Sequence, residues 1–347
     1  MGDVVSATAF MEDLRRAFPR AAVDLNTLPA HAGLFRGDPR FDRLIAPDVR
    51  KDGWRGMVKW LREIAAGDYD LVVDMQSNDR SRLLLALLVL GGRGARWRVG
   101  HRRRFPYHFG PPPDMVWDRP GVFTRSALQA AGIATATAHG KLYVTEAERS
   151  RGGALMGAAG LAAGNYAIFL PGSQRAGFLK RWGVEHYAEL ARLLLARGVA
   201  KIAVVGGPDE VEDCLEIARL GGAGVVNLNG RTGILDVVPL AAGARFVVGN
   251  DTGMAHVCAC TDTPMLVLCG PTDPRRVRPI GPQVLGIQAD IPCKSCYAKT
   301  CSQSDTQRCM KLLTPPWVAD AALQWERGER HWPVPAVPVL GYAGEEN

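Results

Sequence analysis

The residues best suited to chemistry lie where an apolar run meets a short polar turn, in Phe246-Val-Val-Gly-Asn-Asp-Thr-Gly-Met-Ala-His256. The pattern predicts a strand, a tight turn and then a helix. Free backbone N–H groups at the beginning of a helix can bind a diphosphate. Gly253 would let the backbone come close to such a ligand, and Thr252 could donate its hydroxyl. Asp251 could instead only cap the helix, and both interpretations stay open.

Two more polar groups follow predicted strands in the same half of the chain. Gly172-Ser173 comes after one strand and is followed by Lys180-Arg181-Trp182. Lys180 could neutralise a phosphate, although a Lys-Arg pair on a solvated face is an equally simple interpretation. Glu210 follows the next strand and could accept hydrogen bonds from ribose hydroxyls. It could also merely stabilise the positive end of its helix.

Four of the eight cysteines lie close together near the end of the chain, at Cys293, Cys296, Cys301 and Cys309. Four thiolates in one loop could bind a structural zinc ion, although the second pair lacks a tight Cys-x-x-Cys spacing. Free or redox-paired thiols are the alternative. The others lie in helix or strand patterns and are expected to be small core residues: Cys214, Cys258, Cys260 and Cys269.

The elements that must position these residues alternate between strand and helix patterns. This alternation predicts an α/β fold with parallel sheets covered by helices on both faces. Ligands in such sheets bind at the carboxyl ends of the strands. Strands are predicted at 22–27, 70–74, 166–170, 202–205, 225–228, 246–248 and 265–268, and helices at 6–17, 54–66, 81–90, 121–131, 145–160, 184–197, 209–220, 234–242 and 254–260. We expect a first domain at 1–162, a second at 163–330 and a tail at 331–347.

Composition narrows the classes of protein to consider. The chain has 347 residues, 47% of them hydrophobic, which favours two packed domains over disorder. The formal net charge of +7 favours anionic partners, and the densest basic cluster includes Arg102, Arg103 and Arg104. No nucleic-acid motif or aromatic interleaving accompanies the cluster, so we expect no nucleic-acid partner. Without a secretion signal or a spanning apolar run, we expect a cytoplasmic protein. We also expect a monomer, although no motif indicates the oligomeric state.

The same motifs, in the same order, resemble glycosyltransferase family 9, the ADP-heptose:lipopolysaccharide heptosyltransferases. The matching pieces are Gly2-Asp3-Val4, Phe18-Pro19, Asp74-Met-Gln-Ser-Asn-Asp-Arg-Ser81, Gly172-Ser173, Lys180-Arg181-Trp182, Gly206-Gly-Pro-Asp-Glu210, Gly230-Arg-Thr232, Asn250-Asp-Thr-Gly253 with His256, Gly270-Pro-Thr-Asp-Pro274 and the Cys-x-x-Cys with Cys309-Met310. The resemblance covers nearly the whole chain. It is most specific from Gly172 to Pro274.

The resemblance implies a GT-B fold, in which two Rossmann-like domains face each other across a central cleft. It also implies inverting, metal-independent transfer of heptose from ADP-heptose to an anionic glycolipid, with no cofactor. Peripheral contact with the inner face of the cytoplasmic membrane would suit that acceptor, and Arg102, Arg103 and Arg104 would bind it. The implied donor residues are Ser173, Lys180, Glu210, Asp251, Thr252, Gly253 and His256. Lys180 would also stabilise the leaving ADP, and Asp3 would be the general base.

Two positions depart from the family's pattern. Only Met1 precedes Gly2, so the first domain is expected to lack its central first strand, which would expose strand edges. Taken alone, this end of the chain looks disordered. Met254-Ala255 replaces the usual Pro-Met, a small change. The alternatives are a nucleotide-sugar-binding protein with little turnover, and a family member that uses a different nucleotide sugar.

Overall fold

The fold was analysed in a computed structural model that describes residues 1–173, 175–329 and 339–343. The chain forms two compact units. Unit 1 contains Met1–Ser6 and everything from Ala138 onward, and unit 2 contains Ala7–Thr137. Helix α1 (Gly2–Ala17) therefore begins in unit 1 and continues in unit 2.

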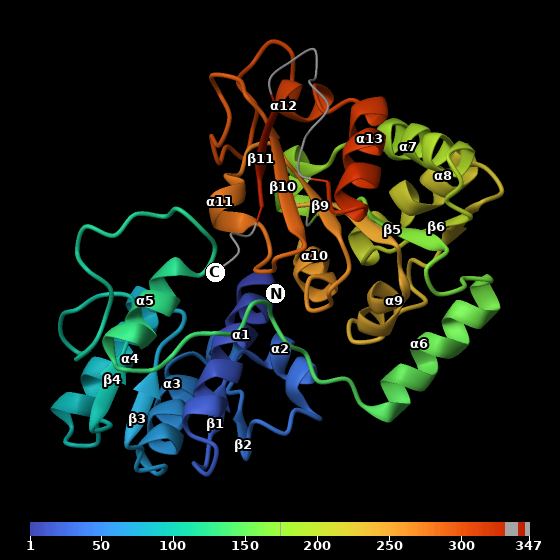
Figure 1. Ribbon diagram of the computed structural model, residues 1–347. Coiled ribbons are helices and arrows are strands. Elements are labelled where there is room, and N and C mark those ends of the chain that lie inside the picture. The colour runs from blue at the N-terminus through green and yellow to red at the C-terminus, as the bar shows by residue number, and fades with distance from the viewer. Residues whose placement is uncertain (174, 330–338, 344–347) are drawn as a thin grey trace. The chain divides into compact units, whose positions relative to one another are not determined.

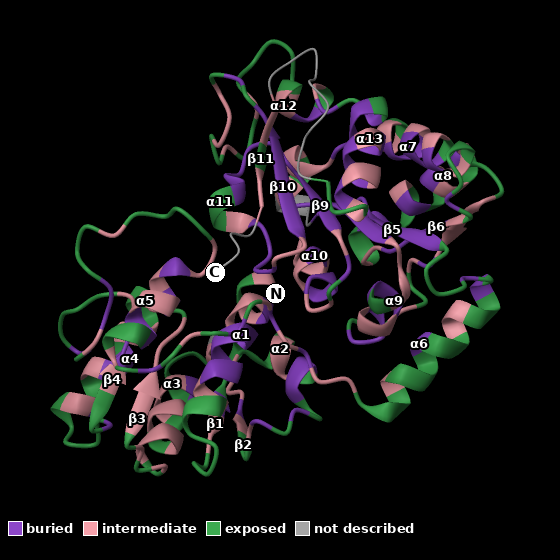
Figure 2. Ribbon diagram, viewed as in Figure 1, coloured by how far each residue is buried: buried purple, intermediate pink, exposed green. Residues whose placement is uncertain are grey.

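Unit 1 is built on a seven-stranded sheet with the order β11-β10-β9-β8-β5-β6-β7. Neighbouring strands are parallel except β10 and β11, which are antiparallel. Its strands β5, β8, β9 and β10 are largely apolar and are buried along their whole length, as Figure 2 shows for β5, β9 and β10. The strands are β5 (Tyr166–Leu170), β6 (Lys201–Val204), β7 (Val225–Asn227), β8 (Phe246–Asn250), β9 (Met265–Cys269), β10 (Val284–Ala289) and β11 (Val339–Tyr342).

Helices cover both faces of this sheet (Figure 1). One face packs against α7 (Val184–Ala196), α8 (Val211–Gly221) and α13 (Pro315–Glu326), which share one apolar core with the strands. The other face carries α9 (Val237–Gly243) and α10 (Gly253–Cys258). The remaining elements are α6 (Glu146–Ala159), α11 (Pro274–Val277), α12 (Arg308–Lys311) and the 3₁₀ turns Arg175–Lys180 and Pro208–Glu210.

Unit 2 has two separate two-stranded parallel sheets in its described residues, β1-β2 and β3-β4. Its strands are only partly buried, and its smaller core includes Leu85, Leu88 and Tyr107. The elements are β1 (Asp24–Asn26), α2 (Pro29–Ala32), the 3₁₀ turn Gly33–Phe35, β2 (Arg43–Ile45), α3 (Val49–Ala65), β3 (Leu71–Val73), α4 (Asp79–Leu90), β4 (Trp97–Val99) and α5 (Val122–Ala130).

Several predictions from the sequence need correction. The start of the chain is helical from Gly2 onward and is not a disordered end. The compact units divide at 137–138, whereas the predicted domain boundary lies at 162–163. Helix α6 belongs to unit 1 because it packs on α9 and its Arg151 pairs with Asp236 at 2.9 Å. Residues 339–342 of the predicted tail form β11, while 330–338 and 344–347 lie outside the described residues.

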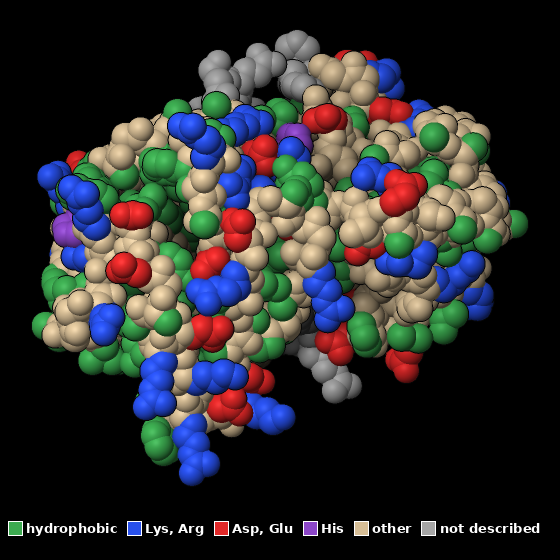
Figure 3. All heavy atoms as spheres, turned by 90° about the horizontal axis from the view of Figure 1, so that it is seen from below, with side chains coloured by type: hydrophobic (Ala, Val, Ile, Leu, Met, Phe, Trp, Pro, Cys, Tyr) green, Lys and Arg blue, Asp and Glu red, His purple; other side chains and the backbone are tan. Residues whose placement is uncertain are grey.

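Charged side chains of both signs are spread over the surface. On the face seen in Figure 3, Lys and Arg side chains lie in several separate groups with Asp and Glu between them. None of the helices in the described residues has the length and apolar character needed to cross a membrane.

Candidate functional site

The candidate site lies where the strand order of unit 1 reverses. β5 lies beside β8, with Leu170 opposite Gly249, and from this pair the chain builds the sheet in both directions. Parallel sheets bind ligands at such a switch point, outside the carboxyl ends of the strands. Asn250, which is fully buried, donates a hydrogen bond to the carbonyl of Pro171 and accepts one from the Tyr187 hydroxyl at 3.1 Å. Asn250, at the end of β8, therefore holds the turn that follows β5 in place through a buried hydrogen bond.

Asp251 lies at the centre of this edge. Its Oδ2 accepts a hydrogen bond from Lys180 Nζ at 2.7 Å and another from Thr272 Oγ1 at 2.9 Å. The side chain is 8% exposed, whereas that of Lys180 is 30% exposed. The structure therefore brings together two residues that the sequence places 71 positions apart.

The alternative role of Asp251 as a simple helix cap is not supported. The N-cap position of α10 is Thr252, and no side chain caps it. Thr272, which the sequence indicated only as part of the Gly270–Pro274 motif, is buried, and its hydroxyl bonds to the same Asp251 oxygen as Lys180. Gln288 fixes the Thr272 backbone by donating to its carbonyl at 2.9 Å.

Glu210 lies beneath the turn that follows β5. A side chain on Gly172 would place its Cβ 2.3 Å from Glu210 Cγ, so glycine is required there. Glu210 Oε2 accepts from the Gly207 amide at 2.5 Å, and its Oε1 lies 3.8 Å from the Arg181 guanidinium. Burial raises the pKa of Glu210, although the Gly207 hydrogen bond and Arg181 oppose this. Helix α8 follows Glu210, and no side chain caps it.

The Ser173 and Trp182 side chains have internal partners. Ser173 is 4% exposed, and its hydroxyl donates to the Gly177 carbonyl at 2.6 Å. Trp182 is a packing residue, because it is 3% exposed and donates to the Leu313 carbonyl. Arg181, to which no role was assigned, donates to the Ser173 carbonyl at 2.9 Å and pairs with Asp213 at 2.7 Å. It thereby connects the Ser173 turn to α8.

The first turn of α1 lies directly against the start of α10. Met1 lies so close to Gly253 that an added Cβ would be 2.7 Å from Met1 Cε. An added Cβ on Gly2 would likewise lie 2.8 Å from His256 Nε2. Ser6 Oγ makes a hydrogen bond with His256 Nδ1 at 2.9 Å, and Asp3 is exposed.

Burial lowers the pKa of His256. Asp251 and Asp3 raise that pKa again, while the chain's amino terminus and Lys180 lower it further. The imidazole is therefore neutral near pH 7. It lies within electrostatic reach of both Asp3 and the residues at the end of β8.

Unit 2 places Arg102, Arg103 and Arg104 in an exposed loop after β4. The His101 amide donates to Ser77 Oγ at 2.8 Å, and Ser77 belongs to the turn that follows β3. The loop also passes Gly110, where an added Cβ would lie 2.6 Å from the Arg102 carbonyl carbon. Three exposed guanidinium groups are thus held beside the carboxyl ends of β3 and β4.

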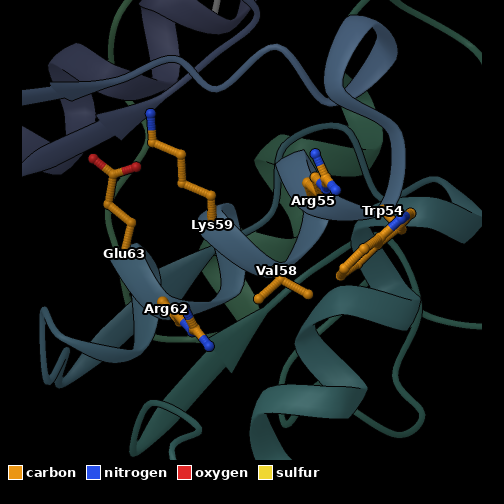
Figure 4. A pocket seen from close by; sticks show the side chains of 6 residues that line it. All are labelled: Trp54, Arg55, Val58, Lys59, Arg62 and Glu63. Carbon is orange, nitrogen blue, oxygen red and sulfur yellow. The ribbon is translucent and has the colours of Figure 1, made fainter.

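A second basic feature of unit 2 is a shallow cavity of about 640 Å³ along α3 (Figure 4). Lys59 and Glu63 extend to the same side of the helix in this view. Three of the lining side chains are cationic and one is acidic, which favours an anionic occupant. The spacing of its basic residues, three or four positions apart on one helix face, is the signal in the sequence that could have indicated this cavity. It is lined by Trp54, Arg55, Val58, Lys59, Arg62 and Glu63.

The four clustered cysteines line one cavity of about 60 Å³ in unit 1. Burial raises the pKa of Cys309 to about 11, and Cys293 contributes to the shift. All eight cysteines are free. Within the described ranges, no three His, Cys, Asp or Glu side chains are arranged to hold a metal ion. The zinc interpretation of Cys293, Cys296, Cys301 and Cys309 therefore gains no support from the structure.

A doubly wound sheet with convergent polar residues at its switch point defines a class, that of the nucleotide-binding α/β proteins. The sequence model of glycosyltransferase family 9 (heptosyltransferase) matches residues 57–306. The chain therefore belongs to glycosyltransferase family 9 and is a glycosyltransferase.

Individual relatives agree with this assignment. The chain is 27% identical to lipopolysaccharide heptosyltransferase 1 of Pseudomonas aeruginosa, over 90% of this chain and 88% of the relative. A family 9 glycosyltransferase of Veillonella parvula superposes with a TM-score of 0.80 at 20% identity, covering 94% and 95% of the two chains. The E. coli heptosyltransferase WaaC with ADP superposes with a TM-score of 0.66 at 23% identity, covering 93% and 96%. The fold is thus GT-B, as predicted.

Proposed function

We propose that the protein transfers heptose from ADP-heptose to an anionic lipopolysaccharide-core glycolipid, with inversion and without a metal ion. The observation that supports this best is the cluster of Lys180, Asp251 and Thr272 at the switch point of unit 1, with Glu210 at the end of the next strand. Relatives described as lipopolysaccharide heptosyltransferases, and a relative solved with ADP, support the choice of substrates.

In this proposal the leaving diphosphate is stabilised mainly by Lys180. An ammonium group has three N–H donors, and Asp251 takes one, so two remain for phosphate oxygens. The backbone amide of Gly253 and the hydroxyl of Thr252 add donors. The helix dipole contributes little, because α10 has only six residues. Glu210 Oε1, which makes no close hydrogen bond with Arg181, accepts from a ribose hydroxyl.

Inversion needs a base that takes the proton of the attacking hydroxyl as the leaving group departs on the opposite face of the sugar. Asp3 is the proposed base, because it is exposed in the first turn of α1, beside the start of α10. Arg102, Arg103 and Arg104 are the proposed contacts to acceptor phosphates. The reaction would take place in the cytoplasm, on a peripheral membrane substrate, and a monomer would suffice.

A transfer assay tests the proposal. Radiolabelled ADP-heptose and a heptose-free lipopolysaccharide acceptor should give labelled product with the inverted anomeric configuration by NMR, and EDTA should not change the rate. Asp3→Asn should lower kcat by about 10²–10⁴-fold, the range of a general base. Asp305→Asn, which removes an exposed carboxylate paired with Lys311, is the matched control.

Two results would contradict parts of the proposal. Binding of ADP without transfer, unaffected by Asp3→Asn, would indicate a nucleotide-sugar-binding protein. Stronger competition by GDP or UDP than by ADP would indicate a different nucleotide sugar.

A further inference from the structure

The side chain of His256 is held between two residues of α1. Ser6 Oγ lies 2.9 Å from Nδ1 on one edge of the ring. The opposite edge, with Nε2 and Cδ2, lies against Gly2, where an added Cβ would be 2.8 Å from each atom. Residues 2 and 6 are four positions apart and share one face of the helix. One helix face thus contacts both ring nitrogens.

We propose that Ser6 is a positioning residue, which donates its hydroxyl proton to His256 Nδ1 and so fixes the proton of the neutral ring on Nε2. The inference rests on the proposed function for its kinetic consequence, but not for the tautomer. Ser6 would act through His256 and would not contact the substrates.

The charges around the ring favour this tautomer. Asp3 and Asp251 are the anionic groups that act on His256, and the amino terminus and Lys180 are the cationic ones. Burial, the largest influence, keeps the pKa of His256 low and the ring neutral. A neutral ring has one N–H, and the Ser6 hydroxyl, which lies against Nδ1, donates to that nitrogen when the ring proton is on Nε2. A proton on Nε2 points an N–H, and not a lone pair, toward the turn that carries Asp3.

The consequence for the reaction is a division of roles between Asp3 and His256. With its proton on Nε2, the imidazole cannot take the proton of the acceptor hydroxyl, which then passes to Asp3, the proposed base. In the other tautomer the Nε2 lone pair would face the same region and would compete with the Asp3 carboxylate. Loss of the Ser6 hydroxyl should therefore change turnover more than nucleotide affinity.

The first test uses NMR on the full chain labelled with ¹⁵N-histidine. The Nδ1 and Nε2 shifts of His256, assigned by their loss in His256→Gln, should show the Nε2–H tautomer alone. Ser6→Ala should give a mixture of tautomers, and Ser6→Thr should restore the single form. A wild-type ring protonated on Nδ1, or Ser6→Ala spectra identical to wild type, would overturn the inference. These results do not depend on whether the protein transfers heptose.

The second test is kinetic. Ser6→Ala should lower kcat about tenfold, as one lost hydrogen bond would, while the Kd for ADP changes by less than about twofold. Ser6→Thr should recover turnover. In the His256→Gln background, Ser6→Ala should have no further effect, because Ser6 acts through the ring. Ser150→Ala, on the exposed face of α6, is the matched control. Additive effects of the two substitutions, or an equal loss of ADP affinity, would contradict the inference.

Discussion

Replacing Lys180 by alanine tests the centre of the candidate site through two separate quantities. In the free protein it removes the ammonium partner of Asp251 and leaves that carboxylate, 8% exposed, with the Thr272 hydroxyl as its hydrogen-bond donor among the described side chains. Exposed ion pairs contribute about 0–1 kcal/mol, and breaking a buried pair costs about 3–5 kcal/mol. Because Lys180 is 30% exposed and water screens it, we expect a loss of about 1–2 kcal/mol. Thermal unfolding should show this as a fall in Tm of about 2–8 °C.

The second quantity is the affinity for ADP, measured by isothermal titration calorimetry. A charge-assisted hydrogen bond to phosphate contributes about 1.5–3 kcal/mol. Its loss should therefore weaken ADP binding by about 10- to 150-fold. Lys311→Ala is the matched control, because Lys311 pairs with Asp305 and both side chains are 54% exposed. It should change Tm and ADP affinity little.

The two quantities together decide the role of Lys180. A fall in Tm with ADP affinity within about twofold of wild type would mean that Lys180 only supports Asp251, since a phosphate contact is worth about tenfold or more. The proposed stabilisation of the leaving diphosphate would then be refuted. Unchanged values for both quantities would refute the structural reasoning as well, because the 2.7 Å pair would have no energetic effect.

Three further predictions concern other parts of the molecule. Gly172→Ala should weaken ADP binding as much as Glu210→Ala does, because its Cβ would displace Glu210, whereas Gly153→Ala, with nothing within 4 Å, should leave ADP binding unchanged. His256, whose pKa burial lowers below 6.5, stays neutral in the folded chain while the unfolded chain takes up a proton. Urea unfolding should therefore show stability falling as pH drops below about 6.5, less steeply in His256→Gln. Replacing Arg102–Arg104 by alanine should raise the KM for the acceptor and weaken its salt dependence, with ADP affinity unchanged.

The central sheet of unit 1 could be predicted from sequence because its strands are continuous apolar runs. The prediction for β5 is correct to the residue, and those for β8 and β9 differ only at the carboxyl end. β10 was missed because Gly286 and Gln288 interrupt its apolar pattern. Gln288 is 1% exposed, and its side-chain amide donates hydrogen bonds to the carbonyls of Gly270 and Thr272. Those contacts exist only in the folded chain.

Unit 2 was harder to predict because its elements are short and only half buried. β4 has three residues, and Arg96 and Arg98 give it no apolar run. Helix α3 begins five residues before the prediction and is interrupted at Gly53, whose φ of +53° is not helical. In the sequence, Gly53 could equally have marked the end of a helix. The periodic apolar pattern of 54–66 therefore predicted only the part of α3 that follows Gly53.

The candidate site was predictable as far as it depends on strand ends. Lys180, Glu210 and Asp251 were all expected near the carboxyl ends of parallel strands, and the structure places them there. The sequence could not show whether Asp251 caps its helix or pairs with other side chains. One of its partners is the Thr272 hydroxyl, which could have bonded to many other groups. The contact of Ser6 with His256 could not be predicted, because the two residues lie 250 positions apart in the sequence.

The arrangement of unit 1 separates the groups that hold the site from those that can reach a ligand. Asn250, Tyr187 and Gln288 are at most 1% exposed, and their hydrogen bonds fix the turns after β5, β8 and β9 from below. Lys180 and Asp3, the proposed charged partners of the leaving group and the acceptor, are the accessible side chains above them. A site built in this way has its backbone geometry set before the substrate binds, so binding energy is not spent on ordering it. Substitutions of these buried supports should therefore lower activity through the positions of Asp251 and Thr272, even though the supports themselves are buried beneath the site.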